Sequence, residues 1–216
     1  MRWLIDFDDT LAIGYMTWAM EHVIPQMIEE FALPYEEETF SRALLHAQKQ
    51  SNENTDDQRV VNEFFDAIGW DYTYQGVLMQ RVYAEGYALQ LYPDTEAFLQ
   101  RLSSDPVNRI FVVSNNPKAP ELAAHLGITA YFEAILTPEI CGSQAKPVAD
   151  MYAYLDAHYP DTGESVMVGD DPWSDGTFAK TCGMTCWLLD RMDRYAVLYP
   201  QEPYRWVKSL DLIGTV

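Results

Sequence analysis

Basic residues are scarce in this chain. Lysine and arginine together number 14 against 33 aspartates and glutamates, which gives a formal net charge of -19. A surface with that balance repels polyanions, so we expect no nucleic-acid partner. A small phosphate-bearing ligand is still compatible with the charge, because a bound metal ion and a few cations can reverse the field locally.

Cysteines and long apolar runs are also few. The chain has 3 cysteines, an odd number with no disulfide framework, which is typical of a reducing compartment. Asp6 and Asp8 interrupt the apolar stretch near the start, and no apolar run reaches the length of a membrane span. We therefore expect a cytoplasmic protein without a signal peptide or a membrane partner.

Length and composition are those of a globular protein. The 216 residues are 48% hydrophobic and 22% charged, close to the averages for folded domains. A chain of this length can form one large domain and a smaller inserted one.

Short apolar runs recur along the chain with helical patterns between them. This alternation predicts an α/β fold with a Rossmann-like parallel sheet and helices on both faces. The expected strands are residues 2–7, 109–113, 134–136, 165–168 and 185–189.

Residues 14–91 break this alternation, because their apolar residues follow helical spacing only. We expect an α-helical domain here, inserted into a core domain formed by residues 1–13 and 92–216. Within the insertion, Pro25 should kink or split the first helix, and residues 51–57 should form an exposed loop.

Polar clusters follow the expected strands at residues 6–10, 114–116, 146–147 and 169–175. Ligands of open parallel sheets bind beyond the carboxyl ends of the strands, so these clusters predict one composite site. Taken singly, each cluster is better explained as ordinary turn chemistry or, for Lys146, as a solvated lysine.

In type, order and context, the clusters closely resemble the motifs of the haloacid dehalogenase (HAD) superfamily of phosphohydrolases. The resemblance spans nearly the whole chain and includes the Tyr-Pro-Asp sequence at residues 92–94, where the family has Tyr-Pro-Gly. It implies a HAD-like core with an inserted helical cap domain.

The resemblance also implies roles for the acidic residues. Asp6 matches the nucleophile that forms an aspartyl-phosphate, and Asp8 matches the acid that protonates the leaving alcohol and later activates water. The cofactor implied is Mg²⁺, held by Asp6, Asp170 and the backbone carbonyl of Asp8, with Asp175 supporting the metal shell.

Phosphate binding is assigned by the same resemblance. Ser114 and Asn115 would contact phosphoryl oxygens, and Lys146 would supply positive charge to the phosphate and the nucleophile. Thr10 and Asp171 lie within the motifs and are expected to support the site.

Two positions depart from the family pattern. Asp9 stands where the family usually has glycine, and Asp171 where it often has serine. Both add carboxylate near the expected metal, so we predict a stronger dependence on the cation, with Asp171 near metal-bound water.

The inserted helices resemble the family's mobile cap, which implies a small phosphorylated metabolite as the partner. Each candidate contact to its leaving group could instead be a solvated surface residue. The candidates are Tyr15, Trp18, Arg42, Lys49 and Arg59. Trp173 could line the substrate pocket or pack against the helical bundle, and we interpret all 4 histidines as structural or exposed.

Other reactions share these motifs. The function we expect is magnesium-dependent hydrolysis of a small phosphate monoester, with a phosphomutase as the nearest alternative. A dehalogenase is disfavoured because such enzymes typically lack a residue like Asp8, and a phosphonatase would need a cap lysine, for which Lys49 is the candidate. A catalytically inactive regulatory protein on the same fold is the alternative from another class.

Overall fold

The chain forms two compact units in a computed structural model that describes residues 1–53, 57–161, 163–193, 195 and 204–214. Met1–Ile13 and Leu89–Val216 form a sheet unit, and Gly14–Ala88 form a helical unit. Residues 89–91, which the sequence pattern places in the insertion, pair with the sheet unit instead. The Ile13 N–H donates to the Gln90 carbonyl, and Leu91 bridges Ala12.

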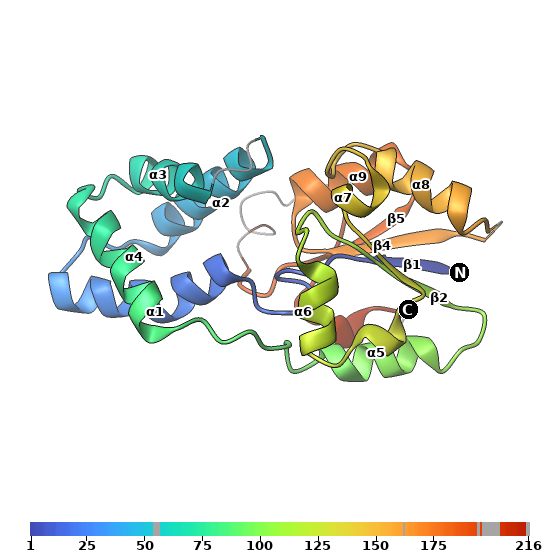
Figure 1. The fold of residues 1–216 in the computed structure, drawn as a ribbon. Helices are drawn as coiled ribbons and strands as arrows, with labels where there is room; N and C mark the ends of the chain where they lie inside the picture. Colours follow the sequence, from blue (N-terminus) through green and yellow to red (C-terminus); the bar gives the residue numbers. More distant parts are fainter. Residues whose placement is uncertain (54–56, 162, 194, 196–203, 215–216) are drawn as a thin grey trace. The chain divides into compact units, whose positions relative to one another are not determined.

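The sheet unit is built on a parallel six-stranded sheet in the order β3-β2-β1-β4-β5-β6, within the described residues (Figure 1). This confirms the predicted α/β fold class. The strands are β1 (Arg2–Ile5), β2 (Arg109–Val113), β3 (Ala134–Leu136), β4 (Ser165–Gly169), β5 (Thr185–Leu189) and β6 (Arg205–Val207).

The five strand positions expected from sequence are confirmed, with β1 ending at Ile5 rather than at residue 7. The edge strand β6 is not among the predicted strands. It has only 3 residues, none of them fully buried, so it lacks the apolar signature of a central strand.

Helices cover both faces of the sheet, as Figure 1 shows for α5 and α6 on one face and α7, α8 and α9 on the other. Successive side chains of β1 point to opposite faces, so Trp3 and Ile5 join one hydrophobic core and Leu4 joins the other. The helices of this unit are α5 (Thr95–Ser103), α6 (Ala119–His125), α7 (Pro138–Cys141), α8 (Asp150–His158) and α9 (Thr177–Thr181), with short turns η1 (Thr129–Tyr131), η2 (Pro172–Gly176) and η3 (Leu210–Leu212).

The helical unit contains α1 (Tyr15–Phe31), α2 (Glu37–Glu53), α3 (Asp57–Ile68) and α4 (Thr73–Glu85). Pro25 lies inside α1 without splitting it. The loop predicted at residues 51–57 is wrong at both ends, because residues 51–53 continue α2 and Asp57 begins α3; residues 54–56 lie outside the described part of the chain. Among the helices described, none is both long enough and apolar enough to cross a membrane.

An aromatic cluster forms part of the core of the helical unit. Phe64 is fully buried and makes edge-to-face contacts with Phe40, Phe65 and Trp70. The Trp70 indole N–H also donates to the Pro34 carbonyl at 2.9 Å. Phe64 therefore links α3 to α2 and to the turn that follows α3.

We predict that Phe64→Ala destabilises the helical unit by roughly 3–5 kcal/mol, because it removes a buried ring and leaves a cavity. Urea unfolding followed by near-UV circular dichroism measures this change. Tyr83→Ala is the control in the same unit, because Tyr83 is 78% exposed, and it should change the unfolding free energy by less than about 0.5 kcal/mol. Equal losses in both variants would contradict a core centred on Phe64.

Candidate functional site

The strand order reverses its direction at β1, a central strand of the sheet. β1 lies between β2 and β4, and the connections on its two sides run in opposite directions across the sheet. Ile5 is in register with Val112 and Val168, so the residues that follow these strands emerge at one edge. This reversal point is where open α/β sheets bind ligands.

Lys146 is buried at the carboxyl ends of the central strands. Its Nζ donates to Asp6 Oδ1 at 2.6 Å and also to Asp175 Oδ1, and only 2% of its side chain is exposed. Burial alone would lower the pKa of Lys146, but the carboxylates of Asp175 and Asp6 outweigh that effect and raise the pKa above its ordinary value. The ammonium therefore stays charged across the physiological pH range.

Burial acts in the opposite sense on Asp6. It raises the pKa of the Asp6 carboxyl well above its ordinary value, and the neighbouring charges of Asp175 and Asp8 add to the rise while Lys146 opposes it. The Asp6 N–H donates to the Val168 carbonyl at 2.8 Å, which fixes the backbone at the end of β1. Asp6 thus occupies a rigid, poorly hydrated position.

The Asp175 side chain is held in place by backbone hydrogen bonds. Its Oδ2 accepts hydrogen bonds from the backbone N–H groups of Asp170 and Asp171, both at 3.2 Å. A Cβ atom built on Gly169 would lie 2.1 Å from the same oxygen. Glycine at position 169 therefore makes room for the Asp175 carboxylate.

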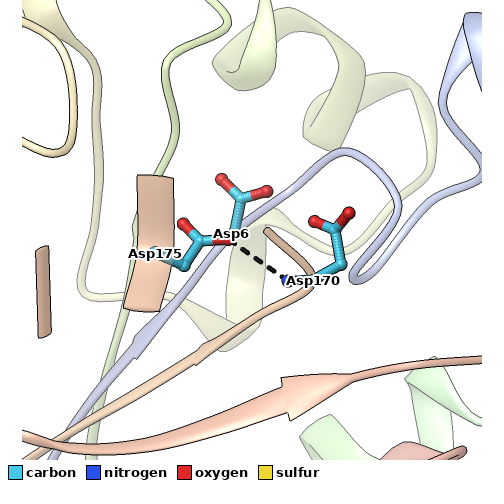
Figure 2. A group of neighbouring side chains, drawn as sticks. All are labelled: Asp6, Asp170 and Asp175. Atoms are coloured by element: carbon cyan, nitrogen blue, oxygen red, sulfur yellow. Dashed lines mark hydrogen bonds between the residues drawn. The ribbon is translucent and has the colours of Figure 1, made fainter. Parts of the chain in front are cut away.

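Carboxylate oxygens of Asp6, Asp170 and Asp175 lie within 4.8 Å of one another (Figure 2). Burial raises the pKa of Asp170 well above its ordinary value, and the charges of Asp9, Asp175, Asp6 and Asp171 add to the rise. Clustered oxygen ligands with this excess of negative charge fit a hard divalent cation. The donor set therefore suits a metal site, and Asp175 is one of the three clustered carboxylates.

Asp8 lies apart from this cluster and has its own partner. The Asn116 Nδ2 donates to Asp8 Oδ2 at 3.0 Å. Burial raises the pKa of Asp8, while the hydrogen bond from Asn116 and the charge of Lys146 partly offset the rise. Asn116 is not among the site residues predicted from sequence, although its place in the 114–116 cluster could have indicated it.

Ser114 and Asn115, two of the three residues expected to bind phosphate, make different contacts. The Asn115 side chain is bonded to the backbone of Lys146, accepting from its N–H at 2.7 Å and donating to its carbonyl at 3.1 Å. Ser114 is buried at the end of β2, and its Oγ accepts from the Asn116 N–H at 3.0 Å. The Asn115 side-chain amide therefore positions the backbone of Lys146.

Asp9 and Thr10 belong to the turn that follows Asp6 and Asp8. Asp9 has a φ of 57°, in the left-handed region that glycine adopts most readily, which gives a physical reason for the glycine usual in the resembled family. The Asp9 N–H donates to the Ala12 carbonyl at 2.7 Å, and the Thr10 hydroxyl donates to Asp170 Oδ1 at 3.4 Å. Thr10 thus links this turn to the carboxylate cluster.

Asp171 has a structural contact that the sequence did not suggest. Its Oδ1 accepts from the backbone N–H groups of Trp173 and Ser174, at 2.8 and 3.1 Å, so it is the N-cap of η2. The ring of Trp173 packs edge-on against Tyr195 within the sheet unit.

The residues named as leaving-group contacts all lie in the helical unit. Trp18 is buried and contacts Tyr87, which corrects the alternative of a solvated side chain, and Tyr15 also packs against Tyr87. Arg42 and Arg59 pair with Glu38 and Glu63 on the surface, and Lys49 is exposed. No histidine belongs to a metal-type cluster in the described parts of the chain.

Comparisons with known proteins identify the family and the fold of the chain. A model of the haloacid dehalogenase-like hydrolase family matches residues 4–183. YfnB from Bacillus subtilis, a proposed HAD-hydrolase bound to magnesium, has a TM-score of 0.63 at 20% identity, with 97% of this chain and 95% of that chain covered.

Two further solved structures have the same fold. A HAD phosphatase from Thermococcus onnurineus has a TM-score of 0.58 at 25% identity, covering 97% of this chain and 94% of that one. An L-2-haloacid dehalogenase from Xanthobacter autotrophicus with covalently bound chloropropionic acid has a TM-score of 0.57 at 18% identity and the same coverage, 97% and 94%. No curated protein matches the sequence.

The family match covers most of the chain and includes the motifs that form the carboxylate cluster and position Lys146. The chain is therefore a member of the haloacid dehalogenase-like hydrolase family.

Proposed function

We propose that this chain is a magnesium-dependent phosphatase that hydrolyses a small-molecule phosphate monoester through an aspartyl-phosphate on Asp6. The observation that carries the proposal is the pairing of two carboxyl groups in different settings. Asp6 accepts a hydrogen bond from the Lys146 ammonium, whereas Asp8, two residues on, accepts one from the neutral amide of Asn116. In the proposed mechanism, the positive charge beside Asp6 favours its ionised, nucleophilic form, and Asp8 is the proton donor.

In the first half-reaction, an Asp6 carboxylate oxygen attacks phosphorus and the bond from phosphorus to the leaving oxygen breaks. The Asp8 carboxyl gives its proton to that oxygen, so the alcohol leaves neutral. In the second half-reaction, the Asp8 carboxylate takes a proton from water, and the resulting hydroxide attacks the phosphorus of the acyl phosphate. Inorganic phosphate and free Asp6 result.

Positive charge and hydrogen-bond donors stabilise the transferred group. Lys146 is fixed by Asn115 and Asp175, so its ammonium is already in place before substrate binds. Ser114 and the backbone N–H of Asn115 are the proposed donors to the phosphoryl oxygens. Mg²⁺ held by Asp6, Asp170 and the Asp8 carbonyl would neutralise charge on those oxygens.

Phosphate esters are favoured over haloacids as substrates because of Asp8. A haloacid dehalogenase of this fold attacks carbon with the same aspartate and needs neither a metal nor a second acid. The Asp8–Asn116 contact and the clustered carboxylates would serve no purpose in that reaction. We propose that the helical unit selects the leaving group, as the caps of the family do.

Asp6→Asn should lower phosphate release by roughly 10³-fold or more, as loss of the nucleophile does in other covalent enzymes. The assay is free phosphate released from a panel of sugar phosphates, nucleotides and phosphoglycolate with Mg²⁺ present. Asp211→Asn, at an exposed carboxylate, is the matched control and should keep full activity. Unchanged activity in Asp6→Asn would disprove the mechanism, and isomerised product without free phosphate would indicate a mutase.

Chelation tests the metal. Excess chelator should abolish hydrolysis, because the clustered carboxylates would then repel the anionic substrate, and added Mg²⁺ should restore it. The extra carboxylates of Asp9 and Asp171 should make this dependence strong. Vigorous hydrolysis in excess chelator would refute a magnesium-dependent reaction.

Gly169→Ala tests the geometry of the carboxylate cluster. The added methyl would displace the Asp175 carboxylate, so Mn²⁺ affinity measured by electron paramagnetic resonance should fall by roughly 10–100-fold. The unfolding free energy should fall by about 1–3 kcal/mol. Gly76→Ala is the control, since a Cβ there meets no atom within 4 Å. Wild-type Mn²⁺ affinity in Gly169→Ala would show that Asp175 is not needed to form the site.

A further inference from the structure

Arg191, which follows β5, reaches back to the turn that carries the acidic residues. Its guanidinium makes two hydrogen bonds to Asp94, Nη1 to Oδ2 at 2.8 Å and Nη2 to Oδ1 at 3.1 Å. Nη2 also donates to the backbone carbonyl of Thr10 at 3.2 Å. Arg191 lies beyond residues 4–183, the region matched by the family, and Asp94 stands where the family motif has glycine.

Asp94 is itself held firmly. Its Oδ2 accepts from the Ser209 hydroxyl at 2.7 Å and from the Leu210 N–H at 2.9 Å. Burial would raise the pKa of Asp94, but the hydrogen bonds from Arg191 and Ser209 outweigh it and hold the pKa below its ordinary value. The ion pair therefore persists at neutral pH and joins the C-terminal segment to the start of α5.

Tyr92 extends the contact to Asp9. The Arg191 guanidinium stacks on the Tyr92 ring, 3.8 Å from its centroid, and the Tyr92 hydroxyl donates to Asp9 Oδ1 at 3.4 Å. The next carbonyl of the turn, that of Leu11, accepts from the Tyr92 N–H at 3.0 Å and from the Thr95 hydroxyl at 2.7 Å. Tyr92 and Thr95 thus hold both the Asp9 side chain and the backbone of the turn in place.

This attachment matters because the turn is conformationally demanding. Asp9 adopts a left-handed conformation, and Thr10 contacts Asp170 of the carboxylate cluster. A displacement of this turn would therefore be transmitted to the carboxylate cluster.

We propose that Arg191 is a positioning residue of the active site: paired with Asp94, it holds the Thr10 carbonyl and the Tyr92 ring so that the turn presents Asp8 and its carbonyl in the reactive geometry. The effect on turnover rests on the proposed phosphatase function. The effect on metal binding does not depend on the reaction that the protein catalyses, because it follows from the position of the turn alone.

The test compares Arg191→Met and Arg191→Lys with the wild-type chain. Both variants should lower kcat by roughly 10–100-fold and weaken Mn²⁺ binding, measured by electron paramagnetic resonance, to a similar degree. The Michaelis constant should change little. Lysine keeps the positive charge, but its single nitrogen cannot reproduce the planar fork by which two guanidinium nitrogens bond Asp94 and the Thr10 carbonyl.

Arg109→Met is the matched control. Like Arg191, Arg109 binds a carboxylate, that of Glu133, through two guanidinium nitrogens, and it donates to the Pro160 carbonyl at 3.0 Å. Arg109 is the first residue of β2, so it lies at the amino ends of the strands, away from the site. It should lower the melting temperature and leave kcat and Mn²⁺ affinity unchanged.

Wild-type kcat and Mn²⁺ affinity in a folded Arg191→Lys protein would overturn the proposal, as would equal losses in Arg109→Met. If the wild-type chain releases no phosphate from any ester and Mn²⁺ binding still weakens in both Arg191 variants, the positioning role stands and the phosphatase proposal fails.

Discussion

The contact of Lys146 with Asp6 and Asp175 is the interaction on which the site depends. Three chain segments meet there: the end of β1, the residues before α8, and η2 after β4. Burying an ammonium without partners costs several kcal/mol. The two carboxylates offset this cost for Lys146, and the ammonium offsets the cost of burying the carboxylates. Asn115 fixes the Lys146 backbone, and Gly169 makes room for Asp175. The sheet edge is thereby organised before any substrate arrives.

Charge balance gives this arrangement its chemistry. The Lys146 ammonium pairs with Asp6 and Asp175, and Asp170 lies in the same cluster, so three carboxylates share one positive charge. The excess of negative charge fits a divalent cation. Asp8 is close in sequence but bonds to Asn116. Two neighbouring carboxyl groups thus meet different environments, and different environments are what separates a nucleophile from a proton donor.

The sequence predicted the parts of the protein that local pattern and motif order determine. Apolar runs located β1 to β5, and the polar residues after them identified Asp6, Lys146 and Asp170. Contacts between distant residues were beyond that reasoning. Arg191 pairs with Asp94 across 97 positions, and β6 is too short and too exposed to show a strand pattern. The N-cap role of Asp171 depends on a turn geometry that its carboxylate does not reveal.

The most direct test of the central claim is to trap the phosphoenzyme. With radiolabelled p-nitrophenyl phosphate, whose leaving group needs no proton, Asp8→Asn should still form the acyl phosphate but hydrolyse it slowly. Acid quenching and peptide mapping should then find label, released by hydroxylamine, on the peptide that contains Asp6. Label on another residue, or turnover with no labelled intermediate, would contradict nucleophilic catalysis by Asp6.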